Sequence, residues 1–550
     1  MKSSACVPSW LLAAALSLPL LVLGAPLIEI DDARYAEVPR AMAASGDWVL
    51  PSLNAMPYIE KPPLWYWLSA TSIKVFGPSE AAARLPMLLL AVLGAGGVFW
   101  LGSWLYSPDI GRCAALATAT SGMWLFLTHN LTLDLPVSVF LLWSTAFILR
   151  ALERPADARW AAPAAWLAAA LAFLSKGLIS ALFPLLWTIT LIGLCPKWRR
   201  PAWKLLSPLG IVLAVLLVAP WFLAVQARRP DFFHTFFIEQ HFQRYLTPKY
   251  SRGAPWWFYL AVLPGGLLPW TAPFLSGLSK VLRRPFTDPR ATALALWALG
   301  VVAFFTTSHS KLATYALPVL PHAALLAAAS IEDGLPKWSR SLCRALGVIL
   351  LLGSVAGVLL YCRLPHLALP EVAANAPLLR RLVVAASACL ACLAAAQLYA
   401  PSSKRPALAL GLGGALAGLC AFAAVSAASP LISAKGLALA VKESARPEDE
   451  VWSYDSYPHG LQFYTGRPVD KMVYFVGEFH YAKRDAANAG RFGDDDEVRA
   501  LPRRGGRTFV VMKTGRRAHF ETVPPKGSIA SWRQFGPWSL AEVRSAARSR

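Results

Sequence analysis

Long apolar runs, separated by short clusters of lysine and arginine, limit most strongly how this chain can fold. About thirteen of them approach the roughly 20 residues that an α-helix needs to cross a bilayer. They lie near residues 9–28, 84–105, 112–130, 135–150, 160–175, 177–195, 205–225, 258–277, 291–307, 313–331, 345–362, 379–400 and 407–428. Charged residues make up only 15% of the chain. The pattern predicts a mainly α-helical, multi-pass membrane protein.

The basic clusters predict the orientation of these helices, because lysine and arginine favour cytoplasmic loops. The clusters are Arg150, Arg154 and Arg159; Lys197, Arg199, Arg200 and Lys204; Lys280, Arg283, Arg284 and Arg290; Lys337, Arg340 and Arg344; and Lys404 and Arg405. The N-terminus is then cytoplasmic. Since much of the net charge of +22 lies in such loops, we expect no nucleic-acid partner.

Polar segments fall on the opposite, outer face of the predicted helices. Two are long loops, about 29–83 and 226–257, and three are turns at His129–Asp134, Ser175–Gly177 and Ser308–Lys311. Ionised groups at the end of a span need water or a partner. We therefore predict an active site at this membrane surface.

The end of the chain changes character. Residues 1–430 are expected to form the transmembrane domain and residues 431–550 a small α/β domain outside the membrane. Short β-like runs are Val451–Tyr454, Leu461–Tyr464, Met472–Phe475 and Thr508–Met512. The arginines of this domain suit an anionic lipid surface, and ordinary solvated charge is an equal alternative.

Several kinds of chemistry find no support in the sequence. The eight cysteines lie almost entirely in or beside apolar runs, which argues against a disulfide framework and a cysteine-based zinc site. No Walker A, GxGxxG, HExxH or GxSxG motif is present, so no nucleotide cofactor is expected. A reaction outside the membrane must then draw on an activated lipid-linked substrate or a gradient.

Carboxylates at the outer ends of two spans are candidates for catalysis. For Asp31 and Asp32, a helix cap or an ion pair with Arg34 or Arg40 is the structural alternative. Asp134 could likewise cap a helix. Because Asp31 and Asp134 share one face, they form a candidate pair for acid–base chemistry or for stabilising the cationic transition state of glycosyl transfer.

Four basic residues on the same face form a complementary set: Lys61, Lys176, Arg244 and Lys311. A phosphate is the simplest ligand for them, and they would neutralise it as a leaving group. The alternative is a side chain that snorkels to the interface, which applies most to Lys176. Glu60, Glu239 and His241 could bind zinc or manganese, although their spacing is no metal signature.

These segments, taken in order, resemble a known family. They are DDARYAEVPRAMAASGDWVLP, YIEKPPLWYWL, LTLDLP, LSKG, DFFHTFFIEQHFQRY, APWWFY and SKLATYALP. They resemble the glycosyltransferases that use polyprenyl-phosphate sugars, above all the bacterial transferases that place 4-amino-4-deoxy-L-arabinose on lipid A. The resemblance covers roughly residues 28–320. It implies a GT-C architecture, a bundle of membrane helices with its active site at the outer face.

The resemblance also implies roles for matching residues. Asp31 matches an essential first-loop aspartate, Asp134 a second important aspartate, and Lys61 a lysine that contacts the donor phosphate. Glu60 and His241 match positions associated with a divalent metal, such as zinc, that joins two outer loops. Further expected substrate-binding residues are Arg34, Tyr35, Arg244, Lys311 and Tyr315.

Two positions depart from the family pattern. Asp31-Asp32 stands where the family usually has Asp-Glu, and Ala313 stands where it usually has proline in Lys-Leu-Pro-Thr-Tyr. Both departures leave the sugar and the acceptor open.

We therefore expect an enzyme of the bacterial inner membrane whose C-terminal domain is periplasmic. It would move 4-amino-4-deoxy-L-arabinose from undecaprenyl phosphate to a lipid A phosphate, among the lipids of the membrane, and so give resistance to polymyxin and other cationic peptides. A protein, another lipid or a glycan is the alternative acceptor. A transporter is a second alternative, although no inverted repeat is evident.

Overall fold

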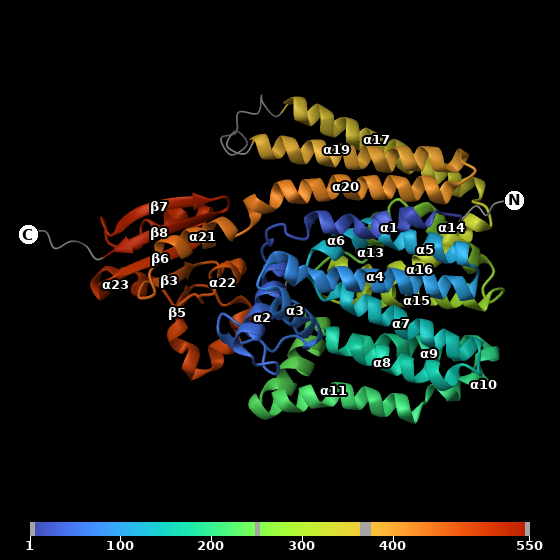
Figure 1. The fold of residues 1–550 in the computed structure, drawn as a ribbon, viewed down its shortest axis with the longest axis horizontal. Coiled ribbons are helices and arrows are strands. Elements are labelled where there is room, and N and C mark those ends of the chain that lie inside the picture. The colour runs from blue at the N-terminus through green and yellow to red at the C-terminus, as the bar shows by residue number, and fades with distance from the viewer. Residues whose placement is uncertain (1–5, 248–252, 364–375, 545–550) are drawn as a thin grey trace, which may run out of the picture. The chain divides into compact units, whose positions relative to one another are not determined.

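The computed structural model describes residues 6–247, 253–363 and 376–544 (Figure 1). These residues form two compact units, and each is described by itself. The first, called the helical unit, is Met1–Leu23, Glu60–Trp65 and Pro86–Ala427. The second, called the sheet unit, is Gly24–Ile59, Tyr66–Leu85 and Ala428–Arg550.

Nine helices in the described part of the chain are long and apolar enough to cross a membrane. They are α4 (Glu80–Leu105), α7 (Asp134–Glu153), α8 (Ala158–Lys176), α11 (Pro208–Arg228), α15 (Pro289–Thr307), η6 with α16 (Ala313–Val319 and Leu320–Glu332), α17 (Lys337–Arg363), α19 (Ala376–Tyr399) and α20 (Pro406–Ile432). The count rises to eleven if two bent pairs each make one span. A multi-pass membrane protein is confirmed, whereas the expected thirteen spans are not.

The bent pairs and shorter helices complete the helical unit. One bent pair is α5 (Pro108–Thr120) with α6 (Gly122–His129), and the other joins α9 (Ile179–Leu194) to the short turns through Leu205. Shorter helices are α13 (Phe258–Gly266) and α14 (Thr271–Arg283). The first helix, α1 (Ser9–Ser17), gives way to a 3-10 turn at Leu18–Val22, because Pro19 lacks the N–H that an α-helix needs.

Local sequence sets where several of these helices begin. α5, α11 and α15 each start with proline, whose missing N–H has no helical partner at that position anyway. The preceding Ser107, Ser207 or Asp288 accepts a hydrogen bond from a free backbone N–H of the first turn.

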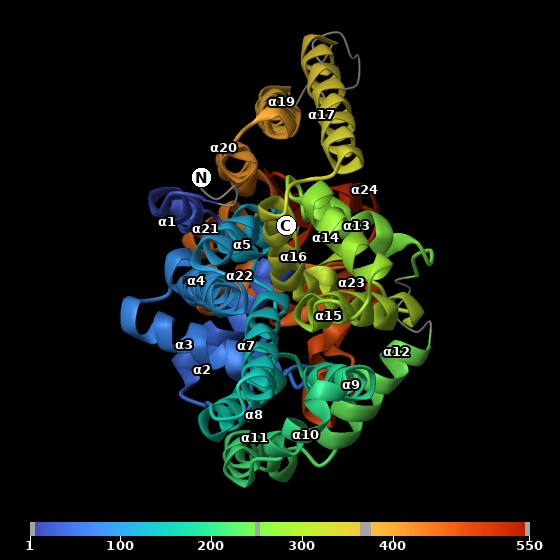
Figure 2. The ribbon, with the colours of Figure 1, turned by 90° about the vertical axis from the view of Figure 1, so that its right-hand side faces the viewer.

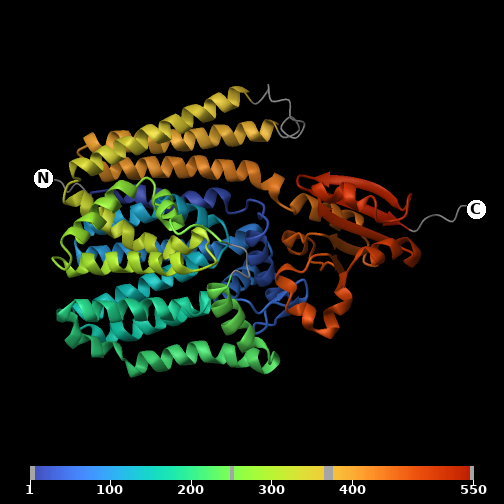
Figure 3. The same cartoon turned by 180° about the vertical axis from the view of Figure 1, so that it is seen from behind.

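The helices of the helical unit run alongside one another, as the side views show (Figures 1 and 3), and are seen end-on in Figure 2. In α7 the most apolar stretch is 83% buried, whereas in α17 it is 17% buried. The side chains that α17 leaves exposed include Leu352 and Leu359. An apolar surface of this kind suits the hydrocarbon interior of a bilayer.

The sheet unit contains a six-stranded mixed sheet in the order β5-β4-β3-β6-β8-β7. The strands are β3 (Glu450–Tyr454), β4 (Lys471–Val473), β5 (Phe492–Gly493), β6 (Arg507–Lys513), β7 (Ile529–Phe535) and β8 (Trp538–Arg544). β3 pairs in parallel with β4 and β6, and β8 pairs antiparallel with β6 and β7. Helix α21 (Lys435–Ser444) precedes β3 in the chain, α22 (His459–Thr465) follows β3, and α23 (Asp495–Arg504) follows β5. A small α/β region at the C-terminus is thus confirmed.

One expected strand is wrong. Leu461–Tyr464 lies in α22, which ends at Gly466, a left-handed residue with φ 71°. A four-residue apolar run fits a strand or one turn of helix equally well, and the glycine that stops the helix decides here. The β7–β8 hairpin was not foreseen from the sequence.

Most of the expected first outer loop is regular structure and belongs to the sheet unit. It forms α2 (Asp31–Ser45), the hairpin strands β1 (Ser52–Leu53) and β2 (Met56–Pro57), and, further on, α3 (Leu64–Phe76). Asn54 at the hairpin exchanges two hydrogen bonds with Val469, of 3.1 and 2.7 Å, and its N–H donates to the Gln462 side chain. The hairpin is therefore joined to the C-terminal part of the chain.

Candidate active site

The two neighbouring carboxylates at the start of α2 have different surroundings. Both lie in the first turn, where the helix dipole favours negative charge. Asp32 is buried, and its Oδ2 lies 2.5 Å from Nη2 of the equally buried Arg84 and accepts a hydrogen bond from the Ile28 N–H. The Asp31 side chain is 53% exposed and forms an ion pair with Arg34. Asp32 is thus a structural group, and Asp31 is the one that can reach a substrate.

Arg34 links Asp31 to the C-terminal part of the sheet unit. Its Nη1 also lies 3.9 Å from Oε1 of Glu478, and its guanidinium lies 5.2 Å from the ring centroid of the buried Tyr35. Arg40, the other expected partner of the first-loop aspartates, instead pairs with Glu37 at 2.6 Å.

A buried histidine continues this line of charges. Nε2 of His459 contacts Glu478, and its Nδ1 lies 3.4 Å from Oε2 of Glu29. Burial lowers the pKa of His459, but the negative charges of Glu478 and Glu29 outweigh this effect and raise the pKa to about 9. Burial likewise raises the pKa of Glu478, and the imidazolium outweighs it and lowers the pKa to about 2. Sequence reasoning missed all three residues, because no motif spacing connects them.

In the helical unit, three elements bring together Asp134, Lys176 and Tyr315. Asp134 is the first residue of α7 and is buried, and its carboxylate pairs with Nζ of Lys176, the last residue of α8. That Nζ lies 4.4 Å from the ring centroid of Tyr315 in η6, within range of a cation–π interaction. The snorkelling alternative for Lys176 is therefore wrong, since its ammonium is held by a carboxylate and a ring.

The second expected outer loop packs on the break between α8 and α9. It contains the π-helix η4 (His234–Gln243), followed by α12 (Arg244–Leu246). Nε2 of His241 accepts a hydrogen bond from the Leu178 N–H at 3.3 Å, and Nδ1 lies 2.6 Å from the Phe236 carbonyl oxygen. Gly177 has φ 89°, and a Cβ there would come within 2.4 Å of His241 Nε2, so only glycine fits.

The fit of a divalent metal depends on His241. Both of its ring nitrogens are engaged with the backbone. Among the residues that the structure describes, no group of three or more His, Cys, Asp and Glu side chains could hold a metal ion. The metal expected at Glu60 and His241 stays a prediction, and no reaction step below depends on it.

The remaining predicted residues are also in the helical unit. Nζ of Lys311 donates to the Ala254 carbonyl at 3.1 Å, and the Tyr259 hydroxyl donates to the Leu312 carbonyl at 3.0 Å. Lys61 is half-buried, as is its neighbour Glu60. The side chain of Arg244 lies outside the described part of the structure.

Comparisons with known proteins give a consistent result. The family described as dolichyl-phosphate-mannose-protein mannosyltransferase matches residues 60–223. An undecaprenyl phosphate-α-4-amino-4-deoxy-L-arabinose arabinosyl transferase of Pectobacterium carotovorum is 34% identical over 353 residues, and one of Yersinia enterocolitica is 33% identical over 310. The aligned regions span 62% and 55% of each chain, so this chain matches about three fifths of its curated relatives' length.

A solved structure matches almost the whole chain. It is ArnT from Cupriavidus metallidurans bound to undecaprenyl phosphate, with a TM-score of 0.83, 25% identity and 98% coverage of both chains. The apo form of the same protein gives a TM-score of 0.81 at 26% identity. The similarity therefore includes the C-terminal region, which lies beyond the residues 28–320 over which the sequence resembles the family.

Proposed function

We propose that this chain is a GT-C glycosyltransferase, which transfers 4-amino-4-deoxy-L-arabinose from undecaprenyl phosphate to a lipid A phosphate. The observation that carries this proposal is the match, over 98% of both chains, to a structure that holds undecaprenyl phosphate. The curated relatives, named for the same donor, support the choice of sugar. Resistance to polymyxin and other cationic peptides follows, because the aminosugar reduces the negative charge of the outer membrane.

We place the enzyme in the bacterial inner membrane, with its N-terminus in the cytoplasm and its C-terminal region in the periplasm. The distribution of lysine and arginine among the loops supports this topology. It assigns both carboxylate clusters, around Asp31 and around Asp134, to the periplasmic side.

The reaction breaks the bond between the anomeric carbon and the undecaprenyl phosphate oxygen, and it forms a bond from that carbon to a lipid A phosphate oxygen. The departing phosphate keeps the electron pair. Because a lipid A phosphate is already anionic near neutral pH, a strong base is unnecessary. Asp31, which is half-exposed, would hold the cationic aminosugar and balance the positive charge that develops on the sugar ring.

The basic residues of the helical unit would serve the leaving group. We assign Lys61, Arg244 and Lys311 to the departing phosphate, because fixed cations stabilise the charge that it gains. Asp134 would hold Lys176 in place through their ion pair, and Tyr315 would limit the movement of the same ammonium.

A protein acceptor is the second candidate, and the match of residues 60–223 to the protein mannosyltransferase family favours it. A serine or threonine hydroxyl is neutral, so it would require Asp31 as a general base. Transfer to a hydroxyl would then require Asp31 to accept the hydroxyl proton, whereas transfer to a phosphate would use only the charge of this carboxylate.

Mass spectrometry of lipid A tests the proposal. The host makes the aminoarabinose donor but lacks its own transferase, and it carries the wild-type chain, Asp31→Asn or Asp109→Asn. Asp109 is a matched control, because it also pairs with an arginine three residues later, Arg112, at the start of α5. We expect one added aminoarabinose with wild type and control, and none with Asp31→Asn. A well-expressed wild-type protein that adds nothing to lipid A would overturn the lipid A acceptor.

A further inference from the structure

Five charged side chains of the sheet unit form one line from its interior to the surface: Glu29, His459, Glu478, Arg34 and Asp31. Their charges alternate in sign. Glu29 and His459 are 4% and 1% exposed, whereas Asp31 at the other end is 53% exposed. Asp31 is thus the member of this line that meets solvent.

The line contains three carboxylates and only two basic groups. The first four groups contribute two negative and two positive charges, which compensate one another. Arg34 is shared, because it lies beside Asp31 and also 3.9 Å from Glu478. A guanidinium that serves two carboxylates neutralises neither of them completely. The excess negative charge therefore falls on Asp31.

The inner end of the line is held by the backbone. Glu29 accepts hydrogen bonds from the N–H groups of His459 at 2.8 Å and Gly460 at 2.7 Å, at the start of α22. A Cβ on residue 460 would lie 2.9 Å from Glu29 Oε1, so this approach depends on glycine. The ring of Tyr457 packs edge-on against His459 at 4.9 Å. His459 therefore has little freedom to turn away from Glu478.

We propose that His459 is a positioning residue for sugar transfer, which holds Glu478 so that Arg34 stays divided between Glu478 and Asp31. The inference rests on the proposed function, because it takes Asp31 as the carboxylate that meets the sugar. Without the imidazolium, the buried Glu478 draws Arg34 to itself, and Asp31 loses the contact that orients it. The C-terminal part of the chain thereby contributes to catalysis without touching the substrate.

A double-mutant cycle with purified full-length protein tests this. Initial rates are measured with undecaprenyl phosphate-linked aminoarabinose and lipid A for wild type, His459→Gln, Asp31→Asn and the double variant. We expect His459→Gln to lower kcat about 10-fold, the scale typical of residues that orient a reactive group, and to leave the KM for the donor unchanged. In the Asp31→Asn background the same substitution should have no further effect, because the two residues act as one unit.

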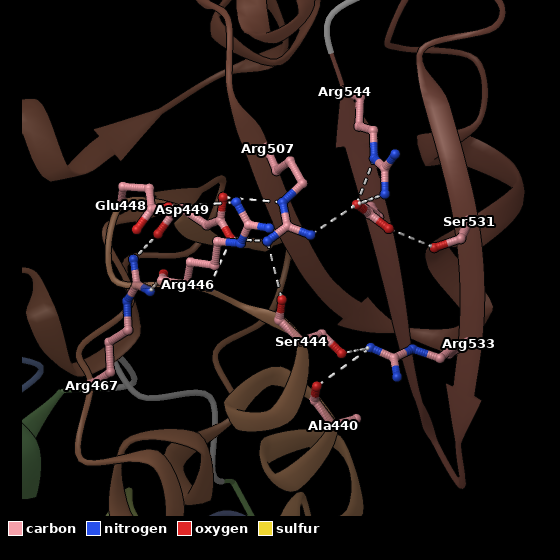
Figure 4. Close-up of polar contacts among 11 residues, drawn as sticks. Ala440, Ser444, Arg446, Glu448, Asp449, Arg467, Arg507, Ser531, Arg533 and Arg544 are labelled. Atoms are coloured by element: carbon pink, nitrogen blue, oxygen red, sulfur yellow. Dashed lines mark hydrogen bonds and ion pairs between the residues drawn. The ribbon is translucent and has the colours of Figure 1, made fainter.

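A matched control removes an ion pair of a buried carboxylate elsewhere in the sheet unit. Figure 4 shows Asp449, whose Oδ2 lies 2.6 Å from Nη2 of Arg507. Asp449 is 5% exposed, and its drawn contacts involve no residue of α2. Asp449→Asn should lower the unfolding temperature with kcat unchanged. If His459→Gln does not fold, Glu478→Gln takes its place in the cycle. The Glu478→Gln variant leaves Arg34 wholly to Asp31, so Arg34 is no longer divided, and kcat should also fall.

The outcomes separate this inference from the proposed function. No transfer by wild type overturns the function. The inference alone is overturned if wild type transfers the sugar normally and Asp31→Asn loses activity, but His459→Gln has an unchanged kcat. An equal loss in both backgrounds, or a loss of kcat in Asp449→Asn as well, assigns His459 to stability and overturns the inference too.

Discussion

Neighbouring aspartates at the start of α2 should have opposite phenotypes when each is changed to asparagine. Asp32 and Arg84 form a pair whose side chains are 0% and 1% exposed, whereas the Asp31 side chain is 53% exposed. Asp32→Asn should therefore destabilise the protein and leave the chemistry intact. Asp31→Asn should leave the protein stable and strongly lower the rate of transfer.

The structure indicates the size of each effect. Removing one partner of a buried ion pair costs about 3–5 kcal/mol. Arg84 keeps its hydrogen bonds to the carbonyls of Ala25 and Pro26, so Asp32→Asn should lie near the lower limit, about 3 kcal/mol. For the exposed pair of Asp31 and Arg34, the loss of stability should stay below about 1 kcal/mol. Loss of one group that stabilises transition-state charge lowers kcat by about 100-fold to 1,000-fold.

The assay measures both quantities on the same samples. Thermal unfolding of the detergent-solubilised protein gives stability, and initial rates with the lipid-linked sugar give kcat. The double variant Asp32→Asn with Arg84→Met should recover stability, because it removes both buried charges. A stable but inactive Asp32→Asn variant would refute the reasoning, since it would make Asp32 the reacting carboxylate.

Four further predictions follow from the same geometry. Folding raises the pKa of His459 from 6.5 to about 9. Its contribution to the stability of the fold is therefore complete below pH 6.5 and is lost as the pH rises through about 9. Over this pH range, the unfolding temperature of wild type should approach that of His459→Gln. Lys176→Met leaves the buried Asp134 unpaired at a cost of about 3–5 kcal/mol, and adding Asp134→Asn should restore the protein yield. Gly177→Ala should lower yield and activity, because its Cβ would clash with His241, and a normal variant would refute the packing. A chelator should leave the transfer activity unchanged, because both ring nitrogens of His241 already contact backbone groups. A loss of activity that added zinc restores would instead support the metal expected at Glu60 and His241.

The sequence by itself determined the class of protein and the two carboxylates of interest. The length and hydropathy of a membrane helix are local properties, so apolar runs such as α7 and α17 can be recognised without knowing what they pack against. Ordered motifs likewise identified Asp31 and Asp134. The number of membrane helices and their end residues were harder to predict. Prolines such as Pro19 end a helix inside an apolar run that hydropathy alone would count as one span.

Only the tertiary structure decided which charges are paired. Lys176 meets Asp134 across 42 residues, and His459 meets Glu29 across 430. It also made Asp32 a structural group beside the exposed Asp31. The physical reason is that the state of an ionisable group depends on its burial and on the opposite charge within a few ångströms. Neither is a property of the neighbouring sequence, and both arise only when distant segments fold together.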